Sequence, residues 1–313
     1  MFRLLKLDWK NFILDFIRNP CMTVSRLKSI VVHGTGERKK ERILKALRDA
    51  GDEFRKRYAD EIDYVMQHQA ADLQVFPYPK LGGIDIKTGF DINLRLPYAI
   101  HDSKRLYFPK LMALTDVERA YRSFIEDEDI FGNGYRTKSP HSYTDAGHFV
   151  EPGDIVLDVG CAEGLFALDC IERVKKAYLF EVLDCWAAPI RATFAPFSEK
   201  TTFIRKLVAD KTGGDKICLS DAVKGCEGDV YFLKMDVEGW EATILSASRA
   251  FLSSNKVKIS CCTYHRQEDE QNIVQLLVSM GFKIRMSNGY MLPPLGEIKP
   301  PYFRRGVVYG RNF

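Results

Sequence analysis

The chain has 313 residues, of which 46% are hydrophobic and 28% are charged, and its formal net charge is +4. This composition is typical of a globular protein of one or two domains, and so small a positive charge does not favour a nucleic-acid partner. No apolar run approaches the ~20 residues that span a bilayer, so we expect no transmembrane segment.

The first 75 residues are predicted to be mainly helical, because apolar side chains recur at helical spacing among many charges. The first 20 residues are amphipathic with basic charge, which allows two interpretations. The favoured one is a helix packed on its own core or on a second copy of the chain, as in a homodimer. The alternative is peripheral contact with a membrane surface near a lipid-linked glycan. The apolar positions are Phe2, Leu5, Trp9, Phe12, Ile13, Phe16 and Ile17, and the basic ones are Arg3, Lys6, Lys10 and Arg18.

The composition and periodicity of the sequence change twice before residue 150. Residues 76–109 are rich in Pro and Gly and alternate in polarity, which predicts a small hairpin. A helix is expected from Thr115. We place a domain boundary near residue 140, between a mainly helical accessory region (1–140) and an α/β domain (141–313). The stretch "SPHSY" at residues 139–143 is expected to form a lid over a ligand site.

The stretch "DIVLDVGCAEGLFAL" at residues 154–168 predicts a strand, a glycine turn and a helix. In open α/β sheets such junctions bind ligands, and glycine lets the backbone approach the ligand closely. Carboxylates around the turn suit a cationic ligand without phosphate, such as S-adenosylmethionine, whereas a dinucleotide is disfavoured because Ala162 replaces the middle glycine of its fingerprint. The remaining alternative is a strand–turn–helix connection of some other α/β protein, with no role in binding this ligand. The predicted cofactor residues in this turn are Asp158, Gly160, Cys161, Glu163 and Gly164.

Strand and helix patterns then alternate to residue 313, which predicts a mostly parallel sheet with helices on both faces. Several expected strands end in acids, at the edge where ligands bind. Glu181 lies about 20 residues after the glycine turn and is expected to accept hydrogen bonds from a ribose. Asp210 is a candidate for an adenine amino group, or a turn residue. The expected strands are 177–182, 201–210, 229–239, 257–265, 282–286 and 304–312.

The segment "LKMDVEGWE" carries three charges at alternate positions, Lys234, Asp236 and Glu238. Three charges on one face of a buried strand indicate either a local ion-pair network or a functional site. We predict Asp236 as a catalytic carboxylate that also contacts the cofactor, with Lys234 beside it and His265 at the end of the next strand. A divalent metal ion held by Asp236 and Glu238 is possible and is left open.

The motifs "VLDVGCAEG", "LFE" and "LKMDVEGWE" together resemble the FkbM-type methyltransferases, a branch of the class I S-adenosylmethionine-dependent enzymes. The resemblance is strongest over residues 150–253. It implies a Rossmann-like seven-stranded sheet whose last strand is antiparallel, and methyl transfer to a hydroxyl oxygen, in many such enzymes of a sugar. One departure is that Thr263 and Tyr264 precede His265 where the family often has an acid.

Three hypotheses about function remain. The first is an O-methyltransferase acting on a carbohydrate or similar polyol, with a small-molecule or glycan acceptor. The second is a nicotinamide-dependent sugar dehydrogenase or epimerase, disfavoured by Ala162 and by the lack of a suitably placed Tyr-x-x-x-Lys pair. The third is a methyltransferase-like binding module without activity.

The eight cysteines bear on compartment and metal binding. None forms a C-x-x-C pair and no cluster of histidines accompanies them, so a zinc site is not expected. Because several lie in apolar contexts, we expect reduced cysteines and a cytoplasmic protein.

Overall fold

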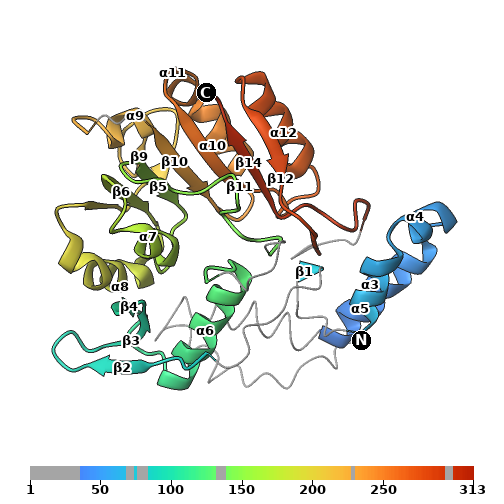
Figure 1. Ribbon diagram of the computed structural model, residues 1–313, viewed down its shortest axis with the longest axis horizontal. Coiled ribbons are helices and arrows are strands. Elements are labelled where there is room, and N and C mark those ends of the chain that lie inside the picture. The colour runs from blue at the N-terminus through green and yellow to red at the C-terminus, as the bar shows by residue number, and fades with distance from the viewer. Residues whose placement is uncertain (1–35, 68–73, 76–83, 132–138, 227–229, 293–298) are drawn as a thin grey trace.

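The structure is a computed structural model, shown in Figure 1. It describes residues 36–67, 74–75, 84–131, 139–226, 230–292 and 299–313. The amphipathic pattern predicted within the first 20 residues lies outside these ranges. Within them, no helix combines the length and apolar character that crossing a bilayer requires.

Seven strands form one sheet in the order β12–β14–β11–β10–β5–β6–β7 (Figure 1). β14 runs antiparallel to both of its neighbours, and every other adjacent pair is parallel. The predicted fold, a mostly parallel sheet with an antiparallel last strand, is therefore confirmed. The bounds are β5 (Ile155–Val159), β6 (Lys176–Phe180), β7 (Thr201–Ile204), β10 (Tyr231–Met235), β11 (Val257–Cys262), β12 (Lys283–Met286) and β14 (Val307–Arg311).

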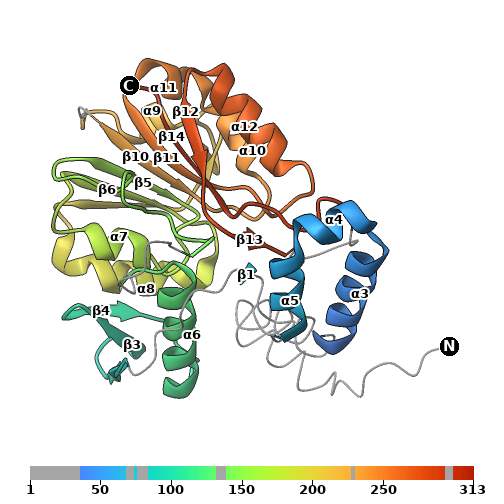
Figure 2. The same ribbon diagram turned by 45° about the vertical axis from the view of Figure 1, so that its right-hand side comes forward.

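Two apolar cores cover the two faces of the sheet. All side chains of β5, β10 and β11 are buried, as expected for strands with helices on both sides. Side chains along each strand alternate between the cores, so Cys261 packs into one and Cys262 into the other. Figure 2 shows the two helical layers, formed by α7 (Leu165–Cys170) and α8 (Asp184–Phe194) on one side and on the other by α9 (Leu219–Ala222), α10 (Glu241–Ala247), α11 (Arg249–Ser254) and α12 (Asp269–Ser279).

The central strands end earlier than the sequence suggested. Val159, Phe180 and Met235 lie side by side in the register and are the last residues of β5, β6 and β10. Glu181 and Asp236 therefore follow their strands rather than belonging to them. The predicted strand 201–210 divides into β7 and β8 (Leu207–Val208), and β8 pairs with β9 (Lys216–Ile217) outside the main sheet.

The residues before 140 contribute to the same core as the sheet. β2 (Thr88–Asp91), β3 (Leu96–His101) and β4 (Lys104–Tyr107) form the predicted hairpin with one additional strand, and α6 (Leu114–Asp127) packs beside them. Leu106, Phe108 and Tyr121 share an apolar core with Phe166 and Phe232. The boundary near residue 140 stays a prediction, and the packing across it is continuous.

A smaller apolar cluster, with helices from the N-terminal part of the chain, lies on the side of the molecule away from α6 and the β2–β4 sheet (Figure 2). The predicted helical region contains α3 (Gly36–Asp49), α4 (Asp52–Arg57) and α5 (Ala59–Gln67), with Gly51 at a positive φ of 84° between the first two. β1 (Gln74–Val75) pairs with β13 (Tyr290–Met291) and joins these helices to the C-terminal region.

The cysteines differ in their state. Six of those in the described part of the chain are free thiols, whereas Cys185 is disulfide-bonded. The expectation of uniformly reduced cysteines is wrong at this position.

Candidate active site

The glycine turn after β5 lies against the segment after β10. Gly160 has φ 74°, and a Cβ built on it would lie 1.9 Å from the backbone oxygen of Asp236. Neither the dihedral angle nor the space permits a side chain there. Gly164, at φ 85°, then begins α7. The predicted turn thus brings two loops of the sheet edge into direct contact.

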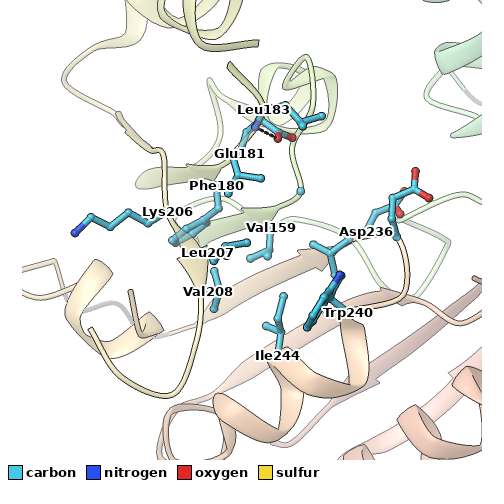
Figure 3. Close-up of a pocket in the computed structure, with 14 residues that line it drawn as sticks. Val159, Phe180, Glu181, Leu183, Lys206, Leu207, Val208, Asp236, Trp240 and Ile244 are labelled. Atoms are coloured by element: carbon cyan, nitrogen blue, oxygen red, sulfur yellow. Dashed lines mark hydrogen bonds between the residues drawn. The ribbon is translucent and has the colours of Figure 1, made fainter. Parts of the chain in front are cut away.

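A pocket of about 300 Å³ opens at this edge, beyond the ends of β5, β6 and β10 (Figure 3). Its lining is mainly apolar, with the carboxylates of Glu181 and Asp236 contributed by two different strand ends. In Figure 3 the two carboxylates lie well apart on the rim, and Trp240 and Ile244 face the space from α10 and the turn before it. The lining residues are Val159, Gly160, Phe180, Glu181, Val182, Leu183, Lys206, Leu207, Val208, Asp236, Val237, Glu238, Trp240 and Ile244.

Glu181 is held by the backbone. Its Oε2 accepts a hydrogen bond from the N–H of Ala162 (3.0 Å), and its Oε1 accepts one from the N–H of Leu183 (2.7 Å). A carboxylate has about four acceptor sites, so both oxygens retain acceptor capacity toward the pocket.

Other predicted cofactor residues lie outside the pocket lining. Asp158 is fully buried and forms an ion pair with Lys234 (Oδ1–Nζ 3.1 Å). Lys234 also donates to the backbone oxygen of Gly160 (2.6 Å). Burial lowers the pKa of Lys234, but Asp158 and Asp236 outweigh it and raise the pKa overall. The local network expected as one interpretation of Lys234 is present, and its catalytic role stays a prediction.

Cys161, Glu163 and Gly164 belong to the turn between β5 and α7 but do not line the pocket, and Asp210 lies beyond β8. Burial raises the pKa of Glu163 to about 7. Cys161 is buried, and burial likewise raises the pKa of its thiol. Asp210 is exposed and does not line the pocket. Leu207 and Val208 of β8, which precede it in the chain, line the pocket there.

Asp236 is the centre of a polar cluster on the side of the pocket away from Glu181. The hydroxyl of Tyr143 donates to its Oδ2 (2.7 Å), and Nε2 of His141 lies 3.3 Å from the same atom. Nε2 of His265 lies 3.4 Å from Oδ1. Burial raises the pKa of Asp236, but His141, His265 and Lys234 outweigh it and hold the pKa well below its usual range. Asp236 is therefore an anion at every physiological pH.

His265 is held between carboxylates. Its Nδ1 lies 2.9 Å from Glu241 and its Nε2 faces Asp236. Burial lowers the pKa of His265, but hydrogen bonding to Glu241 and the charge of Asp236 outweigh it and raise the pKa to about 9. The ring is consequently protonated at neutral pH and cannot accept a proton there. Glu238, the other predicted metal ligand, is 61% exposed and lies 3.8 Å from His265.

Three residues of this cluster were not predicted as site residues, namely His141, Tyr143 and Glu241. His141 and Tyr143 belong to the expected lid "SPHSY". Ser139, Ser142 and Tyr143 are buried, so this segment is packed into the fold, and it reaches the pocket only through the contacts of His141 and Tyr143 with Asp236. Glu241 is the last residue of the motif "LKMDVEGWE". The number of acidic residues in this motif was the feature of the sequence that could have identified Glu241 as a site residue.

The comparisons with known proteins place this site in context. Residues 217–284, which include β10, the Asp236 segment and β11, match the family model described as the methyltransferase FkbM domain. No curated protein matches the chain. The predicted resemblance to the FkbM-type methyltransferases is confirmed over these residues by this match.

Solved structures are similar over about half of the chain. Methyltransferase FkbM from Methylobacillus flagellatus KT has 17% identity over 55% of this chain and 47% of its own, with a TM-score of 0.44. A putative tRNA methyltransferase of Streptococcus pneumoniae in complex with S-adenosyl-L-methionine has 18% identity over 52% of this chain and 69% of its own (TM-score 0.36). A precorrin methyltransferase of Geobacter metallireducens GS-15 has 14% identity over 52% and 81% (TM-score 0.36). The chain thus spans less than half of the length of the Methylobacillus protein.

Proposed function

Because the chain carries an FkbM-type methyltransferase domain, we propose that it transfers the methyl group of S-adenosylmethionine to a hydroxyl oxygen of a sugar, in a glycan, polysaccharide or glycosylated metabolite. The observation that carries the proposal is the pocket at the sheet edge, with an acceptor carboxylate at one end and a charged polar cluster at the other. The sugar rests on the resemblance of the motifs to enzymes of that kind.

The pocket suits the cofactor as follows. Glu181 accepts hydrogen bonds from the ribose hydroxyls through the lone pairs that the backbone leaves free. The adenine packs against the apolar wall formed by Leu207, Val208 and Trp240, rather than bonding to exposed Asp210. The methionine portion passes Gly160, which lines the pocket, toward Asp236. Asp158 and Glu163 act on the cofactor only through the backbone of the turn that they support.

The reaction needs alignment more than activation of the donor. A lone pair of the acceptor oxygen attacks the methyl carbon in line with the carbon–sulfur bond. The electrons of that bond return to sulfur, so the sulfonium becomes the neutral thioether of S-adenosylhomocysteine, and the acceptor proton passes to a base. Asp236 is the proposed base. His265, already protonated, instead positions the Asp236 carboxylate, and Lys234 fixes the turn.

Two experiments test the function. Calorimetry with S-adenosylmethionine, S-adenosylhomocysteine and NAD is expected to show binding of the first two only; binding of NAD alone would support the dehydrogenase instead. Transfer of an isotope-labelled methyl group to a panel of sugars, small alcohols and RNA identifies the acceptor class. Labelling of RNA alone contradicts the proposal, and cofactor binding without any transfer supports the inactive module.

Location and partners extend the proposal. The six free thiols support a reducing compartment such as the cytoplasm, and the disulfide at Cys185 counts against it. Mass spectrometry of the native chain, alkylated with and without reductant, decides between them. Contact of residues 1–20 with a membrane or a second copy of the chain stays a prediction, tested by liposome flotation and sizing of a truncated chain.

A further inference from the structure

Four polar groups converge on one nitrogen atom beside the pocket. The Nε2 atom of His141 lies 3.2 Å from the hydroxyl of Tyr143, 3.3 Å from Oδ2 of Asp236, 3.4 Å from the hydroxyl of Tyr264 and 3.5 Å from Sγ of Cys262. Both tyrosines and the cysteine are buried, whereas the side chains of His141 and Asp236 are 14% and 20% exposed. The cluster is thus enclosed on one side and reachable from the other.

One ring nitrogen meets more hydrogen-bonding groups here than it has bonds to offer. A ring nitrogen offers either one N–H or one lone pair. If Nε2 carries a hydrogen, it can donate to Asp236 but cannot accept from Cys262 or Tyr264. If Nε2 is bare, its lone pair faces the carboxylate of Asp236 with no hydrogen between them. In either form, this nitrogen cannot form a well-directed hydrogen bond with all four groups at once.

The spacing of three of these groups, His141, Asp236 and Cys262, fits a bound metal ion. Tetrahedral zinc binds nitrogen and carboxylate oxygen at ~2.0–2.2 Å and thiolate sulfur at ~2.3 Å, which separates neighbouring ligand atoms by ~3.3–3.6 Å. The observed separations from His141 Nε2 are 3.3 Å to Asp236 Oδ2 and 3.5 Å to Cys262 Sγ. All three ligand atoms lie within 4.8 Å of one another.

We propose that His141, Asp236 and Cys262 bind one divalent transition-metal ion of the zinc and cobalt type, with a fourth position open toward the pocket side. Imidazole and thiolate ligands favour such an ion over magnesium or calcium. The carboxylate and the thiolate balance its two charges. The site is assembled from residues distant in the sequence, which is why cysteine and histidine spacing did not predict it.

The alternative ligands near Asp236 are already engaged. His265 places one ring nitrogen against Glu241 and the other against Asp236, so both of its donor atoms serve carboxylates. Glu238, predicted as a metal ligand, directs its carboxylate to a mostly exposed position. An ion at the His141 site would lower the pKa of a bound hydroxyl, which suits a reaction whose base, Asp236, is a weak one.

The test uses the full chain, stripped of metal by a chelator and titrated with Co²⁺. We expect one equivalent to bind with visible d–d bands and a near-ultraviolet thiolate-to-cobalt charge-transfer band, both removed by Zn²⁺. Cys262→Ser is expected to abolish the charge-transfer band. His141→Gln is expected to weaken the affinity for Zn²⁺ by at least about tenfold. Cys261→Ser is the matched control, because Cys261 is the adjacent, equally buried thiol on the opposite face of the sheet.

The outcomes are decisive in both directions. Absence of Co²⁺ binding by the unsubstituted chain overturns the proposal, as does a charge-transfer band that is missing from the start or that survives Cys262→Ser. Binding of S-adenosylhomocysteine, measured on each variant, shows that the fold is intact. If the unsubstituted chain binds Co²⁺ in this way but not S-adenosylhomocysteine, the proposed function fails and the metal site stands.

Discussion

The two ends of the pocket are built in different ways. The Glu181 end comes from neighbouring elements of the chain, since the turn after β5 and the end of β6 hold this carboxylate through two backbone N–H groups. The Asp236 end is assembled from His141 and Tyr143, from the segment after β10, and from the end of β11 with the residues that follow it. At the first end, the dipoles of backbone N–H groups hold the carboxylate of Glu181. At the second end, the side chains of Tyr143, His141 and His265 hold the carboxylate of Asp236. We therefore expect a substitution at one end to leave the contacts of the other end intact, except at Gly160, where the two ends touch.

The largest effect is expected where the two ends touch. Gly160→Ala places a Cβ 1.9 Å from the backbone oxygen of Asp236 at a positive φ, so both loops must move. We expect a loss of ~3 kcal/mol or more in the free energy of unfolding, and loss of S-adenosylhomocysteine binding. Urea denaturation and calorimetry measure these.

The control is Gly153→Ala, which has a similar φ of 89° but no atom within 4 Å of the added Cβ. It should cost only the strain of the left-handed conformation, ~1–2 kcal/mol, and leave binding intact. Equal losses in both variants would mean that the contact with Asp236 is unimportant.

At the Asp236 end alone, Asp236→Asn should lower the turnover of methyl transfer by ~10²–10⁴-fold while S-adenosylhomocysteine still binds. The variant removes a negative charge that His141, His265 and Lys234 all stabilise. Single-turnover kinetics with the acceptor identified from the panel measure it, with exposed Asp215→Asn as the control. Near-normal turnover would make Asp236 structural.

His265 predicts how this end responds to pH. Its pKa is raised from 6.5 to about 9 in the folded chain, so the folded state holds the proton more tightly than the unfolded state. The stabilisation, up to ~3 kcal/mol, is complete below pH 6.5 and is lost as the pH rises toward about 9. Urea denaturation across this range should show a decline that His265→Gln reduces. An identical decline in both proteins argues against the raised pKa.

The smallest of these effects is expected at the other end of the pocket. Glu181→Ala should weaken the binding of S-adenosylmethionine by ~1–3 kcal/mol, with turnover at saturating cofactor largely retained. Calorimetry compares it with Glu199→Ala, an exposed acid after α8. Unchanged affinity in a folded Glu181→Ala variant would remove the ribose assignment and with it the contrast between the two ends.

The same contrast explains what the sequence could and could not predict. Strand, glycine turn and helix are local patterns, so the sheet, the turn at Gly160 and the place of Glu181 at the carboxyl end of a strand were accessible from residue spacing. The contacts of His141 with Cys262 and Tyr264 cross more than 100 residues, and no local period encodes them. The predicted carboxyl ends of the strands lie one to several residues too late in the chain. The reason is that polar residues at the sheet edge continue the two-residue alternation of the sequence after the backbone pairing has stopped.

The position of β14 has a consequence for how the sheet forms. β12 precedes β14 in the chain, yet within the main sheet its only strand neighbour is β14, which lies between it and β11. β12 therefore cannot join the sheet until a strand from later in the chain has already been inserted. Either β12 and β14 pair with each other first, or β12 joins the sheet only after β14 has paired with β11. Either way, this border of the sheet should open and close as a pair, with the backbone amides of β12 exchanging with solvent no more slowly than those of β14.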